Sequence, residues 1–203
     1  MTRLFARVAA LMLALWPMGA AAQSADVLLN CPACHTVGPE PHTQGLIFPD
    51  LRGQPIRYLE NQLRAFVEGD RQHRQMQLTA EALDKGRGAM ARMYADAPRP
   101  DVVTEPANAA PDLVMQGDWA RGLPPCASCH ALSPGSDRSR TAPRLHGQPE
   151  SYLASQLRAY AEGTRRSDPM GRMRAFAGRL NDPEIADLAR YYAGWTATET
   201  RND

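Results

Sequence analysis

Two short motifs in this chain place a pair of thiols and an imidazole at a spacing that suits a haem. They are Cys31-Pro-Ala-Cys34-His35 and Cys126-Ala-Ser-Cys129-His130. Two cysteines at this spacing can each form a thioether with one vinyl group of a haem, and the histidine that follows can bind its iron. The motifs therefore predict two covalently bound haems c, attached through the four cysteines, with His35 and His130 as axial ligands.

Four cysteines also allow two other interpretations, disulfides and zinc. Disulfides are common in exported proteins, but they do not require a histidine directly after each second cysteine. A structural zinc site needs four ligands, and each half of the chain offers too few additional Cys or His residues. Haem attachment remains the favoured use of the cysteines.

The second axial ligand of each haem is expected to be a methionine. Met76 lies seven residues before Leu83-Asp84, and Met173 lies seven residues before Leu180-Asn181. We therefore expect Met76 at the first haem and Met173 at the second. Met170 is the alternative at the second haem, because it aligns with Met76 when no gap is introduced.

Other histidines and methionines compete for these roles. His73 is an alternative ligand of the first haem because it lies close to Met76, and Met90 and Met93 are further candidates there. We expect Met90 and Met93 to pack in the core of a helix instead, since core packing is the ordinary role of methionine. His42 and His146 do not recur in both halves and are expected on the surface.

The two motifs begin two copies of one unit, which we call half one and half two. The segments 49–55 and 143–149 share the pattern Pro-x-Leu-x-Gly-Gln-Pro, and the match continues without a gap into Tyr-Leu-x-x-Gln-Leu-Arg-Ala. Identities in this number indicate a duplication. The repeat therefore predicts that the two halves have the same fold.

Helical patterns dominate both halves, and no segment alternates as a strand would. Pro55 and Pro149 suit the first turn of a helix that ends near Gly69 or Gly163. The last helix of half two is predicted to have Asn181 or Asp182 as its cap and Pro183 in its first turn, with an apolar stripe before Gly194. Residues 89–94 form a weaker counterpart in half one. The fold class is therefore expected to be all-α.

The first 22 residues have the features of an export signal. Arg3 and Arg7 precede a short apolar stretch, and Ala20-Ala21-Ala22 offers a cleavage site. The expected organisation is a signal peptide at 1–22, a first domain at 23–104 and a second at 105–203, with a Pro- and Ala-rich linker at about 98–112. We expect a periplasmic protein with no membrane span after cleavage. The near balance of 23 Lys+Arg against 22 Asp+Glu argues against nucleic-acid binding.

With its paired Cys-x-x-Cys-His motifs, its Pro-x-Leu-x-Gly-Gln units and its Leu-Asn-Asp-Pro-Glu-Ile ending, the chain resembles the dihaem cytochrome c4 family over nearly its whole predicted mature length. The resemblance implies two tandem cytochrome c-like domains, each wrapped around one haem held by His and Met. It also selects Met173 over Met170. Half one departs from the pattern after Met76, where Asp84-Lys85-Gly86-Arg87-Gly88 lacks a clear helix cap.

The resemblance implies an electron carrier rather than an enzyme, with redox proteins as its partners, among them a membrane terminal oxidase. Two alternatives stay open. The chain could be the electron-accepting subunit of a dehydrogenase, which the same motifs would serve. It could also be a dihaem redox enzyme with one open iron site, because the irregular segment after Met76 leaves the distal side of the first haem undecided.

Overall fold

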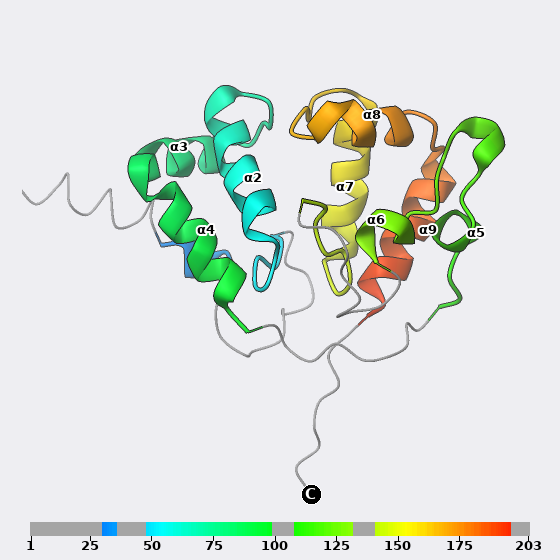
Figure 1. Ribbon diagram of the computed structural model, residues 1–203, viewed down its shortest axis with the longest axis horizontal. Helices are drawn as coiled ribbons and strands as arrows, with labels where there is room; N and C mark the ends of the chain where they lie inside the picture. The colour runs from blue at the N-terminus through cyan, green and yellow to red at the C-terminus, as the bar shows by residue number, and fades with distance from the viewer. Residues whose placement is uncertain (1–29, 36–47, 99–107, 132–140, 196–203) are drawn as a thin grey trace, which may run out of the picture.

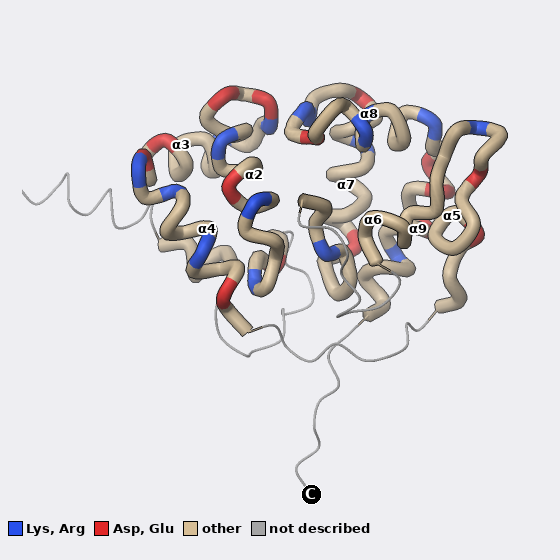
Figure 2. Tube along the Cα trace, viewed as in Figure 1, with Lys and Arg blue, Asp and Glu red and all other residues tan. Residues whose placement is uncertain are grey.

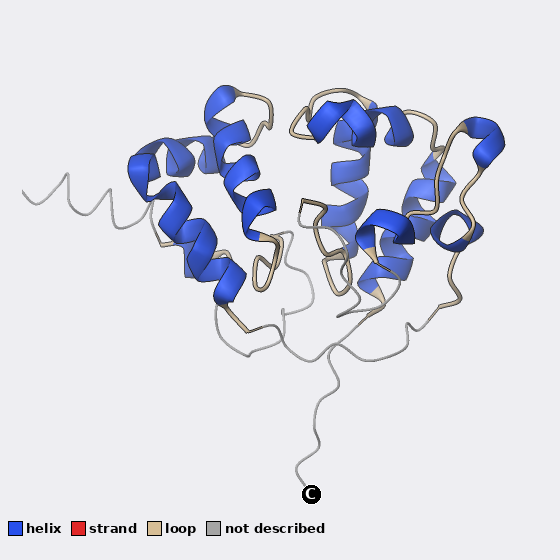
Figure 3. Cartoon of the chain, in the orientation of Figure 1, coloured by secondary structure: helices blue, strands red, loops and turns tan. Residues whose placement is uncertain are grey.

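The computed structural model describes residues 30–35, 48–98, 108–131 and 141–195. Within these ranges all regular elements are helices (Figure 3), and extended pairing is limited to the isolated bridges Arg71–Arg165 and Asp118–Leu123. The all-α prediction is confirmed. The predicted signal peptide, the domain boundary near residue 105 and His42 lie outside the described residues.

The helices fall into two groups that lie side by side, with α2 and α7 innermost (Figure 1). Half one contains η1 (Cys31–Ala33), α2 (Ile56–Glu68), α3 (Arg74–Leu83), η2 (Asp84–Gly86) and α4 (Arg87–Asp96). Half two contains α5 (Asp112–Met115), η3 (Trp119–Arg121), α6 (Ala127–His130), α7 (Glu150–Ala161), η4 (Pro169–Gly171), α8 (Arg172–Ala177) and α9 (Asp182–Ala193). Acidic and basic residues are interspersed along both halves (Figure 2).

The repeated helices α2 and α7 begin and end in the same way. Each starts directly after its proline, one residue later than predicted, because the proline carbonyl already accepts the first helical hydrogen bond: the distance from the nitrogen of Leu59 to the oxygen of Pro55 is 3.1 Å. Gly69 ends α2 in the left-handed conformation at a φ of 76°, which glycine adopts without steric cost. Gly163 has a φ of 72° just beyond α7, so the predicted stop signals are confirmed.

The last helix of each half packs against the repeated helix. In half two, α9 starts with a capping box in which the side chain of Asn181 accepts from the Glu184 N–H and the Glu184 carboxylate accepts from the Asn181 N–H. In half one, α4 confirms the predicted counterpart. It has no such box, because the short turn η2 joins α3 directly to it.

The apolar core is larger in half two than in half one. The predicted α9 stripe is buried, and Leu188 and Tyr192 join Leu153 of α7 in the main core cluster. Half one has a smaller cluster made of Leu59, Ala91 and Tyr94. Met90 packs against that cluster as expected, but the prediction for Met93 was wrong, because its side chain is 42% exposed.

The surface prediction for His146 was also wrong. This side chain is only 1% exposed, and its ring lies edge-on against Tyr192 and Trp195, with centroid distances of 5.3 and 4.9 Å. The repeat places Arg52 at the equivalent position of half one, where it is fully buried and ion-paired with Asp50 at 2.8 Å. At this position of the repeat, half two therefore buries an imidazole ring and half one buries a guanidinium.

Among the residues described, no helix combines the length and the apolar character that crossing a lipid bilayer would require.

Gly147 provides a test of the close packing between the repeated loop and the end of half two. Its φ is +73°, and a Cβ atom would lie 2.9 Å from the carbonyl oxygen of Trp195. We expect Gly147→Ala to lower the free energy of unfolding by about 1–3 kcal/mol, through backbone strain and this collision. Guanidinium unfolding of the haem-loaded protein measures the loss.

Gly163→Ala is the matched control. Gly163 has nearly the same φ, +72°, but open space where its Cβ would lie. Its replacement should cost about 1 kcal/mol from strain alone. Equal losses in the two variants would contradict a role for the contact with Trp195.

Candidate haem sites

A cavity of about 480 Å³ is lined by residues of both halves and lies along the innermost helices α2 and α7. It brings together seven of the eight predicted site residues, namely Cys31, Cys34, His35, Met76, Cys126, His130 and Met173. Cys129 is the exception, since its side chain is exposed and does not line the cavity. The four cysteines are not disulfide-bonded.

The two motif histidines are buried and make the same hydrogen bond. Nδ1 of His35 lies 2.9 Å from the carbonyl oxygen of Pro49, as Nδ1 of His130 does from that of Pro143. A carbonyl only accepts hydrogen bonds, so Nδ1 carries the proton and donates. Nε2 is therefore left with its lone pair, the form in which a histidine binds a metal. This geometry fits haem iron.

Burial also keeps the imidazole of His130 neutral. Removal from water disfavours the charged form and lowers the pKa of His130, and the carbonyl of Pro143 opposes this shift only partly. Burial likewise raises the pKa of the Cys126 thiol to about 11, so this thiol is protonated at neutral pH. Both residues are therefore uncharged where they line the cavity.

The two predicted methionines occupy matching positions. Met76 lies in the first turn of α3 and Met173 in the first turn of α8, and both side chains are half-buried and line the cavity. In each half this helix follows the repeated helix and packs against it. Both methionines therefore lie in the first turn of the helix that follows the repeated helix.

Met170 differs from Met173 both in its exposure and in its position relative to the cavity. Its side chain is 78% exposed and does not line the cavity, and its φ of 58° places it in a tight left-handed turn. At the other haem site, His73 and Met90 line the cavity together with Met76, whereas Met93 does not. His73 caps α3, because its Nδ1 accepts a hydrogen bond from the Met76 N–H at 3.3 Å.

A polar seam joins the two halves, built from the repeated Gly-Gln units. The side-chain amide of Gln148 bonds both backbone groups of Asp50, at 2.9 and 2.6 Å, and that of Gln54 bonds both backbone groups of Arg144, at 2.9 Å each. Asp50 and Arg144 are equivalent in the repeat. The seam therefore has the pairing of a twofold-symmetric interface within one chain.

Sequence reasoning did not identify this seam. The same junction also contains polar residues that recur on the innermost helices, and their repetition was the available signal: Tyr58 and Tyr152 with Gln62 and Gln156. Burial raises the pKa of Tyr58 to about 12, so its hydroxyl stays neutral at the junction. A polar side chain that recurs at a buried position indicates a specific partner, here the other half of the chain.

Comparison with known proteins finds relatives among cytochromes and electron acceptors. No protein-family model matches the chain. The chain is 31% identical over 180 residues to a thiosulfate dehydrogenase electron acceptor from Thiomonas intermedia, which covers 85% of this chain and 82% of the relative. It is also 31% identical over 167 residues to cytochrome c4 from Thiocapsa roseopersicina, covering 81% and 86% of the two chains.

Solved structures give the same relationship. Thiosulfate dehydrogenase (TsdBA) from Marichromatium purpuratum matches with a TM-score of 0.70 and 32% identity, covering 85% of this chain but only 38% of that one. Reduced cytochrome c4 from Pseudomonas stutzeri matches with a TM-score of 0.62 and 26% identity, covering 86% of this chain and 98% of that one. The fold is therefore that of two tandem cytochrome c domains.

The seam predicts that Gln148 stabilises the protein through the opposite half. Gln148→Ala removes two buried hydrogen bonds and leaves the backbone of Asp50 without them, so we expect a loss of about 1–3 kcal/mol in the free energy of unfolding. The control is Gln116→Ala, which removes only an exposed contact with Asp112 and should change stability by less than about 0.5 kcal/mol. Denaturant unfolding that cannot separate the two variants would contradict the role given to the seam.

Proposed function

Because the chain belongs to the cytochrome c4 family, whose members carry two covalently bound haems c, we propose that it is an exported electron carrier that accepts electrons from a dehydrogenase. Electron transfer through two haems follows from the family. The periplasmic location, the partner and the ligand residues are our proposals. The signal peptide at 1–22 and the domains at 23–104 and 105–203 remain predictions.

The proposed haem 1 is attached to Cys31 and Cys34, with His35 and Met76 as its axial ligands. The proposed haem 2 is attached to Cys126 and Cys129, with His130 and Met173. The observation that carries this assignment is the matched geometry: in each half a buried histidine with its Nδ1 committed to a proline carbonyl lines the same cavity as a first-turn methionine.

The competing ligands have less support. His73 uses Nδ1 to cap α3, and it has no equivalent near Met173. Met90 packs against the core cluster of half one from α4. Met76 has a counterpart in half two, Met173, which also lies in the first turn of the helix that follows the repeated helix, as duplication of one unit leads us to expect.

Each haem, when bound, supplies a one-electron couple. The chain's own residues set how that couple behaves. The proline carbonyls orient His35 and His130, and a methionine as the second ligand would favour Fe(II) and raise the potential relative to a second histidine. If a methionine also binds each iron, no axial position stays open for a substrate, so this assignment supports a carrier and disfavours the redox-enzyme alternative.

A dehydrogenase is the favoured electron donor because of the relatives. The Thiomonas relative is named as an electron acceptor of thiosulfate dehydrogenase, and the Marichromatium structure is a thiosulfate dehydrogenase that contains a region of this fold. The cytochrome c4 relatives support a second candidate, a free carrier. We expect such a carrier to pass its electrons on to a membrane oxidase. The two roles are compatible, because an acceptor of electrons must also release them.

The methionine assignment predicts which substitutions alter a haem. Met173→Ala should change the spectrum of haem 2 and lower its potential by on the order of 0.1 V, within the range of about 0.8 V that axial ligands span. Met76→Ala should do the same at haem 1. Met170→Ala and Met93→Ala are the controls, since both side chains are exposed and should leave both haems unchanged. Rapid carbon monoxide binding to the reduced wild-type protein would contradict two His/Met haems.

The proposed electron donor is tested by measuring how fast the oxidised protein is reduced in a mixture with a dehydrogenase. The oxidised protein, combined with thiosulfate and a catalytic amount of a relative's thiosulfate dehydrogenase, should be reduced at both haems much faster than with thiosulfate alone. Ascorbate serves as the control that both haems can be reduced. Full reduction by ascorbate without any acceleration by the dehydrogenase would reject thiosulfate dehydrogenase as donor and leave the general carrier.

A further inference from the structure

Two apolar side chains of half two are the most exposed of their kind on the described surface. Met170 is 78% exposed and Trp119 is 72% exposed, whereas the other exposed large apolar side chains of the described residues reach at most 47%. A single exposed apolar side chain is common and needs no explanation by its exposure alone. The conformation of each residue therefore decides whether its exposure carries information.

Met170 has a backbone conformation that does not suit a methionine. Its φ of 58° lies in the left-handed region, which glycine adopts without steric cost. The proposed methionine ligand follows the glycine after the repeated helix by ten residues in half two and by seven in half one, so η4 lies in a stretch that is longer than its equivalent. The exposed side chain of Met170 gains no burial that would offset the strain. Strain of this kind indicates a role outside the fold.

Trp119 lies in a loop whose conformation is fixed by hydrogen bonds and ion pairs. The backbone groups of Asp118 and Leu123 exchange two hydrogen bonds, at 2.7 and 2.8 Å. The carboxylate of Asp118 pairs with Arg121 at 2.7 Å, and Arg121 also pairs with Glu184 of α9 at 2.7 Å. The indole is therefore presented to solvent on a fixed support. A partner that binds such a side chain loses little conformational entropy, and tryptophan is among the residues that contribute most to binding.

The two side chains belong to one continuous surface, because the loop that carries Trp119 contacts the segment after α8. The carbonyl oxygen of Arg179, two residues after α8, accepts a hydrogen bond from Nη1 of Arg121 at 3.1 Å. The guanidinium of Arg179 lies 3.8 Å from the place that a Cβ on Gly122 would occupy. Met170 lies just before the other end of this short helix. We call the following residues the α8 surface: Trp119, Met170, Arg172 and Arg179.

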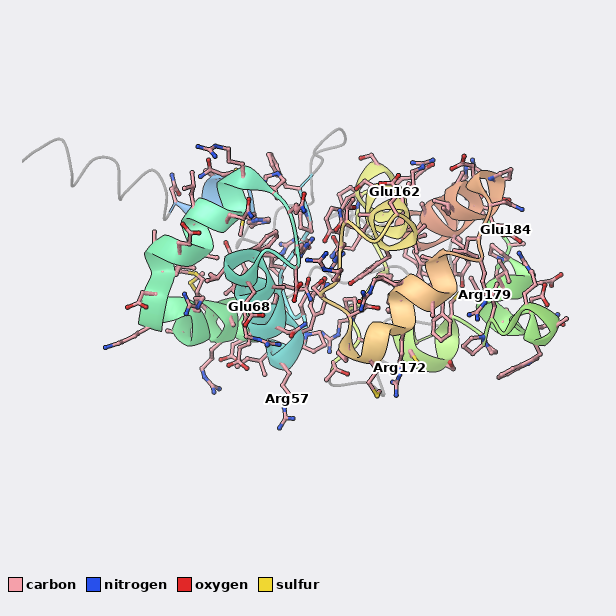
Figure 4. All side chains as sticks on the ribbon, turned by 90° about the horizontal axis from the view of Figure 1, so that it is seen from above. Arg57, Glu68, Glu162, Arg172, Arg179 and Glu184 are labelled. Carbon is pink, nitrogen blue, oxygen red and sulfur yellow. The ribbon has the colours of Figure 1, made fainter. Side chains whose placement is uncertain are left out.

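The charge of the α8 surface is positive. Residues 169–181 include three arginines and no acidic residue, whereas α3, the equivalent helix of half one, has one arginine and one glutamate. Arg172 and Arg179 have exposed side chains, and Arg172 points away from the ribbon (Figure 4). Positive charge beside exposed apolar side chains is complementary to a protein surface that has carboxylates around an apolar patch.

We propose that the α8 surface is the docking site of an acidic redox protein. The partner's carboxylates contact the two exposed arginines, and its apolar patch contacts the methionine and the indole. The same short helix carries Met173, which lines the cavity, so a docked partner is one helix away from the proposed haem 2. The inference rests on the proposed function as an electron carrier. It does not depend on whether thiosulfate dehydrogenase is the donor.

The test measures electron transfer from reduced flavodoxin, an acidic flavoprotein, to the oxidised haem-loaded protein by stopped flow at several ionic strengths. Salt screens the attraction between the two surfaces, so we expect the second-order rate constant of the wild type to fall as salt is added. Hexaammineruthenium(II), a small cation that needs no docking surface, reports the reactivity of the haems themselves. Wild-type haems that accept electrons from neither reagent would contradict the proposed function, not the docking surface alone.

Charge reversal tests the two arginines. Arg172→Glu combined with Arg179→Glu should lower the rate constant with flavodoxin by about tenfold at low ionic strength and much less at high ionic strength. Arg172→Glu alone should give a smaller loss of the same kind. Its matched control is Arg57→Glu, because Arg57 is an exposed arginine of half one that points away from the ribbon on the same side of the molecule (Figure 4). An equal loss in Arg57→Glu would mean that total charge steers flavodoxin, and it would overturn the proposal.

Met170→Gly separates docking from folding, because the two should change in opposite directions. Glycine relieves the strain at positive φ, so we expect the variant to unfold at a higher denaturant concentration than the wild type. Loss of the side chain should lower the rate constant with flavodoxin several-fold at both low and high ionic strength, and Trp119→Ala should do the same. The control is Met93→Ala, which removes an exposed methionine of half one and should leave the rate constant unchanged.

The rate constant with hexaammineruthenium(II) and the haem spectra should be those of the wild type in every variant. Reduction by flavodoxin at the wild-type rate in both Met170→Gly and the double arginine variant would overturn the proposal. So would equal losses with flavodoxin and hexaammineruthenium(II), because these would place the effect at the haem and not at the docking surface.

Discussion

A cavity runs through both halves of this molecule in the place where a small domain would normally have its core. Half one buries only a small apolar cluster around Leu59, Ala91 and Tyr94, which is a thin core for its length. The bound haems supply the missing apolar volume. The innermost helices, the methionine-bearing helices α3 and α8 and the loops that hold the histidines are therefore arranged around the space for a cofactor.

The second constraint is the seam between the halves. An apolar seam would hold two domains together without fixing their register, whereas the Gln54 and Gln148 amides each satisfy both backbone groups of one residue across the junction. Buried polar groups that are fully hydrogen-bonded specify one arrangement, since a shifted arrangement would leave them unsatisfied. A carrier with two redox centres needs such a fixed geometry, because electron transfer between the centres depends on their separation.

The sequence was most informative where a residue's role is local. The Cys-x-x-Cys-His motifs, the capping box at Asn181 and the stop at Gly69 each depend on near neighbours, and the duplication supplied a second example of most of them. His146 and Arg165 could not be placed in this way, because their burial depends on partners tens of residues away or in the other half. The periodicity of a sequence does not predict which polar side chains are buried. Methionine is ambiguous too, since Met93 was predicted in the core and is exposed.

The repeat also diverges at one informative place. Asp50 and Arg52 of half one form a buried ion pair, while their equivalents in half two are Arg144 and His146. Duplication thus preserved the backbone pairing of the seam at residues 50 and 144, while the side chains there diverged: that of Asp50 pairs with Arg52 within half one, and that of Arg144 donates across the seam to the carbonyl oxygen of Gly53. Charge and hydrogen bonding around a haem set its potential. Asp50 and Arg144 both line the cavity, so the exchange makes the surroundings of the two proposed haem sites chemically unequal. Unequal potentials would give electron flow within the chain a preferred direction.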